Sequence, residues 1–270
     1  MDLLPLLKKI ESPDDAHRRR AIINEISSLG LTPIIDGYKV EDFRGDNIMV
    51  TLPGQIRKKI VLIAHTDTFK GSPGANDDAS GCTILLDILR RLKGQKLKYA
   101  VKFIFFDQKE KGMVGSRAYL RKFEIDNVIA VLNPKMVGLG DSFVTWAVDR
   151  KTKKGVALSA MRRACKSLGV HLEELKYLEE LSGDYVSFKE EGNNNSLAFA
   201  TSPLQELKLL KQYVRHPLWS YGKYKLGLLR FPKLFKHYHN SLDRSIFLSE
   251  ASLQMSAEML YRTVSYLGKI

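Results

Sequence analysis

Three nearly continuous apolar stretches of strand length constrain the fold more than any other feature of this sequence. They lie at 59–64, 99–106 and 128–132. Continuous apolar runs of this kind are typical of strands that are covered on both faces. Helix-like stretches separate them, at 82–92 and 116–123. Strands that alternate with helices predict one α/β domain with a mixed, mainly parallel sheet and helices on both faces.

The rest of the chain extends the same alternation. Ser12 is a good helix cap, Pro13 suits the first helical position, and Gly30 suits a helix end. At 270 residues the chain is long enough to bury a full hydrophobic core. We expect further helices at 3–10, 12–29, 153–168 and 248–267, and further strands at 32–40, 47–52, 143–148 and 197–200.

Polar residues gather where the apolar stretches end. Ligands of open α/β sheets bind at the carboxyl ends of the strands, so we expect a functional site there. Asp77 and its neighbour Asp78 lie between Gly74 and Gly81, at a strand-to-helix corner. Adjacent carboxylates repel each other, so a cation is expected to hold them, either a metal ion or a lysine. The polar residues in this region are His65, Asp67, Asp77, Lys109, Glu110 and Lys135.

Five segments of the chain resemble the M28 family of zinc aminopeptidases and, more distantly, the glutaminyl cyclases that share their fold. The resemblance runs from about Asn47 to the C-terminus, and it implies a single M28 peptidase-like domain over 1–270. The segments are His65-Thr66-Asp67, 74–81, 105–116, 184–188 and 238–243.

The resemblance also implies roles for single residues. Asp67 and Asp78 would support the metal ligands, and a cis peptide would join Asp77 to Asp78. The family's metal ligands would correspond here to His65, Asp77, Glu110 and His239. Tyr238 would make a hydrogen bond in the transition state, and Asp184 with Tyr185 would contribute to substrate binding.

The sequence departs from the family pattern at two charged positions. Lys109 stands where the family has its general base, and Lys135 stands where an aspartate binds the first zinc. That zinc would lose a ligand and gain a cationic neighbour, so we expect its site to be empty. The second ligand set, Asp77, Glu110 and His239, is intact and would suit one catalytic-type zinc. Smaller departures are Tyr185 in place of a histidine and 193–195 in place of Gly-Ile-Pro.

Charge counting supports a rival interpretation of the same site. Asp77 and Glu110 contribute two negative charges, and Lys109 and Lys135 contribute two positive charges. The site is therefore neutral without any metal. A metal-free site and a site with at most one zinc both stay open.

The catalytic consequence is the same in both cases. In the family a carboxylate base takes a proton from zinc-bound water, which a protonated lysine cannot do. We therefore expect a pseudo-peptidase that binds a peptide or a small amino compound. The alternative is a single-zinc hydrolase, cyclase or acyl-transfer enzyme that uses Asp77, Glu110 and His239.

Basic residues dominate the composition and one segment in particular. The formal net charge of +13 favours an acidic partner or an anionic surface. The segment at about 205–238 has eight basic residues against a lone Glu206, interleaved with aromatic residues, and we interpret it as an insertion that forms a rim or lid near the pocket. An acidic peptide, an anionic membrane surface or a nucleic acid would fit it. Because no known nucleic-acid motif is present, we do not expect nucleic acid as the partner.

The remaining features bear on location. No run of 18 apolar residues is present, so we expect no membrane span. The start of the chain lacks the features of a signal peptide, and Cys82 and Cys165 are expected to be buried, reduced thiols. These features together predict a cytoplasmic location.

Overall fold

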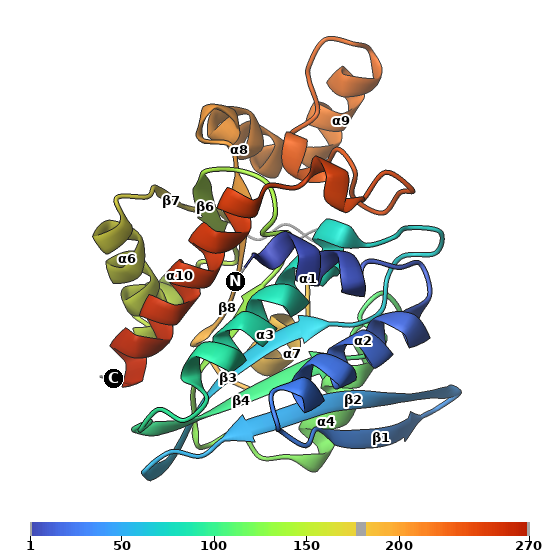
Figure 1. Cartoon of the computed structure of the whole chain (residues 1–270). Helices are drawn as coiled ribbons and strands as arrows, with labels where there is room; N and C mark the ends of the chain where they lie inside the picture. Colours follow the sequence, from blue (N-terminus) through green and yellow to red (C-terminus); the bar gives the residue numbers. More distant parts are fainter. Residues whose placement is uncertain (1, 177–181, 269–270) are drawn as a thin grey trace.

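The computed structural model describes residues 2–176 and 182–268 and is built on one mixed sheet (Figure 1). In the described residues the eight strands follow the order β1-β2-β4-β3-β5-β8-β6-β7. The four central strands, β4, β3, β5 and β8, run parallel, whereas β1, β2 and β6 each have an antiparallel neighbour. This confirms the expected α/β domain. The strands are β1 Ile34–Val40, β2 Phe43–Leu52, β3 Ile56–His65, β4 Tyr99–Phe106, β5 Val128–Pro134, β6 Ser142–Thr145, β7 Leu172–Glu174 and β8 Ser196–Ser202.

Helices cover both faces of the sheet, as expected. Figure 1 shows α1, α2, α3, α6 and α10 in front of the sheet, with α4 and α7 behind it. The helices are α1 Leu3–Ile10, α2 Asp15–Ser28, α3 Ser80–Leu92, α4 Val114–Lys122, α5 Arg150–Lys153, α6 Val156–Leu168, α7 Tyr185–Glu190, α8 Leu207–Arg215, α9 Pro217–Lys225 and α10 Glu250–Gly268. No helix in 2–176 or 182–268 has the length and apolar character needed to cross a bilayer.

The strand pleat divides the core into two clusters. Along β3, Ile60 and Leu62 join the cluster on the side of α1, α3 and α10, whereas Val61 and Ile63 join the cluster on the side of α7 and α8. This alternation is what a strand with both faces buried requires. The two cysteines are free and buried, as expected.

Several predicted boundaries were wrong, and β2, expected from 47, begins at Phe43. The helix expected from Ser12 begins at Asp15, because the carboxylate of Asp14 accepts the N–H of Ala16 over 2.9 Å and so caps it. The strand expected to reach Val148 ends at Thr145. The helix expected over 153–168 is divided into α5 and α6, because Gly155 takes an extended conformation that restarts the helix.

The parallel strands place their carboxyl ends at one edge of the sheet. His65 ends β3, Phe106 ends β4, and Pro134 ends β5, so the polar residues that follow each strand meet there. A short kinked turn, Ala75–Ala79, in which Asp77 and Asp78 have non-helical backbone angles, carries Asp77 over the same edge before α3 begins.

Candidate functional site

Asp77 is the residue on which the other site residues converge. Gly74, which precedes its turn, has φ +63, and a Cβ there would lie 2.5 Å from Oγ1 of Thr68. A cis peptide joins Asp77 to Asp78, as the resemblance implied. The carboxylate of Asp243 accepts the backbone N–H of Asn76 over 2.8 Å and that of Asp77 over 3.0 Å. Asp243 therefore fixes the backbone of the corner, and the side chain of Asp77 remains free to contact the other site residues.

The predicted metal ligands lie together around Asp77. His65 Nε2 is 3.2 Å from Asp77 Oδ1, and His239 Nε2 is 3.4 Å from Asp77 Oδ2. His239 Nε2 is also 3.2 Å from Glu110 Oε2. Ligand atoms of His65, Asp77 and Glu110 lie within 4.8 Å of one another, which makes this group a candidate for holding a metal ion.

Lys109 and Lys135, two of the residues expected at this edge of the sheet, contact the same carboxylates. Lys135 Nζ lies 3.4 Å from Asp77 Oδ1 and donates to the backbone oxygen of Ser182 over 3.3 Å. Lys109 Nζ donates to Glu110 Oε1 over 2.8 Å. Each of these carboxylates thus has one oxygen beside an ammonium and the other beside His239.

The two supporting carboxylates hold the site from behind. Asp67 accepts the backbone N–H groups of Lys109 and Glu110, each over 2.9 Å. Its own backbone oxygen lies 2.9 Å from His65 Nδ1. Asp78 accepts the backbone N–H of His65 over 3.3 Å. Asp67 therefore couples the end of β3 to the segment that follows β4.

Burial and neighbouring charges set the protonation of the pocket. Burial alone would lower the pKa of Lys109, but Asp77, Tyr238 and Glu110 raise it well above its ordinary value. For Lys135, burial prevails and lowers the pKa, although Asp77 opposes the shift. Burial would raise the pKa of Asp77, but Lys135 and Lys109 hold it well below its usual range. Against the effect of burial, His239 holds the pKa of Glu110 at about 2.

One side of the site has the spacing of a zinc ligand set. Asp77 Oδ2 and His239 Nε2 are buried and face each other at 3.4 Å, but among the described residues neither meets the geometry of a regular hydrogen bond. Tetrahedral zinc with bonds of about 2.0–2.1 Å separates its ligand atoms by about 3.3 Å. The distances of 3.4 Å and 3.2 Å from His239 to Asp77 and Glu110 match that spacing. His65, Asp77 and Glu110, with His239 beside them, are therefore the candidate position for an ion, and the Lys135 ammonium lies beside the Asp77 oxygen that faces His65.

Tyr238 lies against this group, whereas Tyr185 lines a separate cavity with Ala147 and Val186. The Tyr238 ring stacks on that of His239 with centroids 3.7 Å apart, and the Lys135 ammonium lies 5.6 Å from its centre. Asp184 is buried, and burial raises its pKa to about 6. Tyr185 is buried with its ring edge-on to Trp146. The roles assigned to these residues from the sequence stay predictions.

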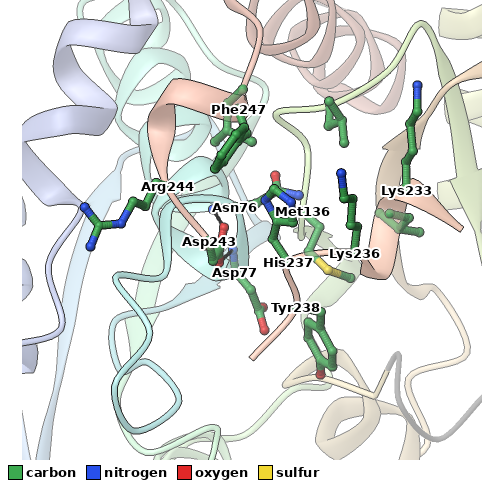
Figure 2. A pocket seen from close by; sticks show the side chains of 13 residues that line it. Asn76, Asp77, Met136, Lys233, Lys236, His237, Tyr238, Asp243, Arg244 and Phe247 are labelled. Atoms are coloured by element: carbon green, nitrogen blue, oxygen red, sulfur yellow. Dashed lines mark hydrogen bonds between the residues drawn. The ribbon is translucent and has the colours of Figure 1, made fainter. Parts of the chain in front are cut away.

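Two cavities adjoin Tyr238. The first has about 450 Å³ and is lined by Lys109, Glu110, Gly112, Met113, Ser182, Tyr238 and His239. The second has about 220 Å³ and shares Asp77 and Tyr238 with the site (Figure 2). Figure 2 shows Lys233 and Lys236 on one wall of this second cavity and Phe247 on another. The basic segment expected at about 205–238 thus borders the site.

Sequence reasoning missed two side chains that position the site. Arg18 is buried, and its guanidinium donates to the backbone oxygens of Thr66, Pro73 and Gly74 over 2.6–3.0 Å. The helical pattern contained a signal, because Arg18 shares the inward face of α2 with Ile22 and Ile26 at intervals of four residues. Phe69 stacks on His239 with ring centroids 4.5 Å apart, and no sequence signal pointed to it.

Sequence comparisons connect this geometry to known proteins. The model described as "Peptidase family M28" matches residues 47–264. A probable leucine aminopeptidase of Trichophyton verrucosum is 29% identical over 147 residues, and leucine aminopeptidase 1 of Ajellomyces capsulatus is 33% identical over 121 residues. The alignments cover 47% and 38% of this chain, but only 39% and 31% of those relatives. Less than half the length of either relative is therefore matched.

Solved structures show the same fold. LapA aminopeptidase of Legionella pneumophila has a TM-score of 0.74 at 15% identity, covering 100% of this chain and 72% of that one. A leucine aminopeptidase precursor of Bacteroides thetaiotaomicron has a TM-score of 0.71 at 16% identity, with 97% and 95% covered. Glutaminyl cyclase of the same organism, bound to N-acetylhistamine, has a TM-score of 0.69 at 16% identity, with 97% and 96% covered. Since the family model spans most of the sequence and the fold agrees, this chain belongs to peptidase family M28.

Proposed function

We propose that this chain is a pseudo-peptidase, which binds a peptide or a small amino compound but does not turn it over as an ordinary aminopeptidase. The observation that carries the proposal is the ion pair between Lys109 and Glu110, with Nζ and Oε1 2.8 Å apart. In this proposal Lys109 occupies the position of the family's general base. Its raised pKa keeps the ammonium protonated, so it cannot accept a proton from an attacking water.

Lys135 limits the pocket to one metal ion at most. We assign it the position of the aspartate that would bind the first zinc. A divalent ion about 4 Å from the ammonium would be repelled by roughly 8 kcal/mol at an effective dielectric of about 20. The ligand set that remains is Asp77, Glu110 and His239, with His65 held by Asp67. A zinc ion bound there would polarise a carbonyl group of the ligand.

The charges of the pocket suit a zwitterionic ligand. Asp77 and Glu110 would attract an amino group, and the ammonium groups of Lys109 and Lys135 would attract a carboxylate. The backbone oxygen of Ser182 already accepts from Lys135, which brings the segment of Asp184 and Tyr185 to the pocket wall. We therefore include Asp184 and Tyr185 in the ligand-binding part of this proposal.

A second candidate function is a single-zinc hydrolase or cyclase-like acyl-transfer enzyme. The buried atoms Asp77 Oδ2 and His239 Nε2 favour it, because among the described residues they face each other at 3.4 Å without a regular hydrogen bond, and a ligand could satisfy both. The fold shared with a glutaminyl cyclase is consistent with it. In this candidate Lys109 would assist only by pairing with Glu110.

Metal analysis and an activity assay separate the two candidates. The protein is produced in zinc-supplemented medium, its zinc content is measured, and leucine anilide and N-terminal glutamine peptides are offered as substrates. If the chain is a pseudo-peptidase, we expect no turnover of either substrate. Dipeptides should raise its melting temperature, and this effect should be lost in Glu110→Gln. The control Glu190→Gln, which changes an exposed side chain, should keep it. Zinc-dependent turnover that disappears in Glu110→Gln alone would establish the enzyme instead.

A further inference from the structure

Several large apolar side chains on α9 and in the turn after it are exposed in the part of the chain that the structure describes. Leu218 is 89% exposed, Trp219 is 50% exposed, and Leu226, which directly follows the helix, is 74% exposed. Leu228, in the turn beyond, is 69% exposed. Figure 1 shows α9 and the turn after it projecting from the top of the molecule, away from the sheet. Exposed apolar residues gathered on one projection mark an interaction surface.

Helix geometry puts these residues on one stripe. At about 100° per residue, positions 218, 219 and 226 fall within roughly 100° of one another around the axis of α9. Ser220, the buried residue of α9, lies on the opposite side. Lys223 falls just beyond one edge of the stripe and Lys225 just beyond the other. The helix and the residue after it therefore present two leucines and a tryptophan on one side, with a lysine on each flank, while the exposed Tyr221 and Tyr224 lie on the other side.

The cations around the stripe are available to a partner. Lys223 lies 3.9 Å from the centre of the Trp219 ring, and Lys225 lies 5.3 Å from that of Tyr221. Neither ammonium has a carboxylate partner within 2–176 or 182–268. The lone acid of the basic segment, Glu206, is already paired with Arg230 at 3.7 Å. The projection thus carries a positive charge that its own segment does not neutralise.

We propose that α9 and the turn after it form a peripheral membrane-binding surface for anionic lipid headgroups. Leucine and tryptophan side chains at the tip would enter the boundary between headgroups and acyl chains, while the flanking lysines would pair with lipid phosphates and carboxylates. A nucleic acid would use the aromatic rings and lysines but leave the leucines in water. An acidic peptide would likewise pair with the lysines alone. The exposed leucines are therefore the observation that favours a lipid surface over both.

This surface lies in the same segment as the site. The segment that contains α9 continues into Lys233 and Lys236, which line the second cavity, and then into Tyr238 and His239. A chain that is bound through α9 would hold its pocket close to the lipid surface. The inference rests on α9 and not on the chemistry proposed for the pocket, so either one can fail alone.

Vesicle flotation tests the proposal directly. The full chain is mixed with vesicles of phosphatidylcholine alone or with added phosphatidylserine. We expect binding only with phosphatidylserine, weakened by salt. Lys223→Gln with Lys225→Gln should weaken binding roughly tenfold to thirtyfold. The matched control is Lys58→Gln with Lys96→Gln, at the amino ends of β3 and β4 and away from α9, and it should bind like the parent.

The apolar side chains have their own test. Leu218→Ser with Leu226→Ser should abolish flotation, whereas Ile56→Ser, which changes an exposed isoleucine at the start of β3, should leave it intact. Of the two tryptophans, Trp146 is buried, so a blue shift of emission on vesicles would report Trp219, and Trp219→Phe should remove it. Thermal melting of each variant checks that the fold is kept.

Three outcomes would overturn the proposal. The first is no flotation with phosphatidylserine vesicles at low salt. The second is flotation that persists unchanged in Leu218→Ser with Leu226→Ser. The third is tighter binding to single-stranded DNA or to polyglutamate than to the vesicles, with loss in the lysine variant only. That last result would assign the surface to a nucleic acid or to an acidic peptide.

Discussion

The ammonium nitrogen of Lys135 lies 3.4 Å from Oδ1 of Asp77, and both side chains are buried. An ion pair in such a place is costly to assemble but more costly to break, because removal of one partner leaves the other charge buried and uncompensated. A change that removes either charge from the pocket should therefore lower the free energy of unfolding of the whole chain.

Lys135→Met should destabilise the protein by about 3 kcal/mol in metal-free buffer, since it leaves the Asp77 carboxylate without its nearest ammonium. Urea unfolding measures the change. Lys122→Met is the matched control, because Lys122 pairs with Asp36 over 2.9 Å with its side chain 39% exposed. Loss of that surface pair should lower the free energy of unfolding by less than about 1 kcal/mol. Equal decreases in the free energy of unfolding of both variants would show that the buried pair stabilises the protein no more than the surface pair does.

Lys109→Glu with Lys135→Asp should convert the pocket into a site that needs zinc. Without metal, crowded carboxylates resist ionisation, so the melting temperature should fall below that of the parent. With zinc it should recover, because a ligand that binds only the folded state stabilises it. Thermal melting with and without zinc measures both effects, and hydrolysis of leucine anilide should appear only in the zinc-loaded variant.

The control for this double change is Lys151→Glu with Lys153→Asp, on the exposed side of α5. Its melting temperature should not respond to zinc. If the pocket variant also ignored zinc, the two lysines would not face the metal position. Strong zinc-dependent activity in the parent would equally refute the replacement of the general base by Lys109.

Arg18→Met should destabilise the protein by about 3 kcal/mol or more, because three buried backbone oxygens lose a charged donor. Its effect should also reach the pocket, since Thr66 and Gly74 flank His65 and Asp77 in sequence. Chemical denaturation gives the stability, and dipeptide binding gives the effect on the pocket. Arg20→Met, a change of an exposed arginine of the same helix, should have little effect on either.

Asp184→Asn should stabilise the protein at neutral pH. Burial raises the Asp184 pKa from 3.8 to about 6, so the folded state favours the protonated carboxyl. Its contribution to stability is then full below pH 3.8 and is lost as the pH rises through about 6. The free energy of unfolding of the variant should exceed that of the parent by up to about 3 kcal/mol above pH 6, and the two should be equal near pH 4.

Unfolding free energies measured across that pH range give the test for Asp184. Asp126→Asn, a change of an exposed carboxyl, provides the baseline and should match the parent throughout. A difference between Asp184→Asn and the parent that stays constant with pH would mean that the carboxyl does not titrate in the folded protein as its burial predicts.

The parallel core was predictable because burial on both faces leaves a continuous apolar pattern. The stretches at 59–64, 99–106 and 128–132 became β3, β4 and β5 for this reason. The strands near the edge of the sheet were harder to predict. The strand expected at 143–148 is shorter in the structure, and β7 was not predicted, since a strand of three residues has too few positions to show a period.

The site was predictable where a motif lies within one segment and not where contacts join distant ones. His65, Asp77, Glu110 and His239 were found from local motifs, and the structure brings them together. Arg18 was missed because its hydrogen-bond partners lie 48–56 residues away. The pairing of Lys109 with Glu110 rather than Asp77 depends on side-chain rotamers, which no sequence pattern specifies.

The hydrogen bonds from Asn76 and Asp77 to Asp243 span 167 and 166 residues. Until the segment around Asp243 is in place, the two amide groups lack the carboxylate that accepts them, and an unpaired buried amide is unfavourable. Contacts of such long sequence separation carry a large entropic cost of loop closure. A chain still emerging from the ribosome would thus lack a competent pocket even with its sheet in place. The corner that carries Asp77 is therefore fixed only when segments 166 residues apart have met, so its order reports on the fold as a whole.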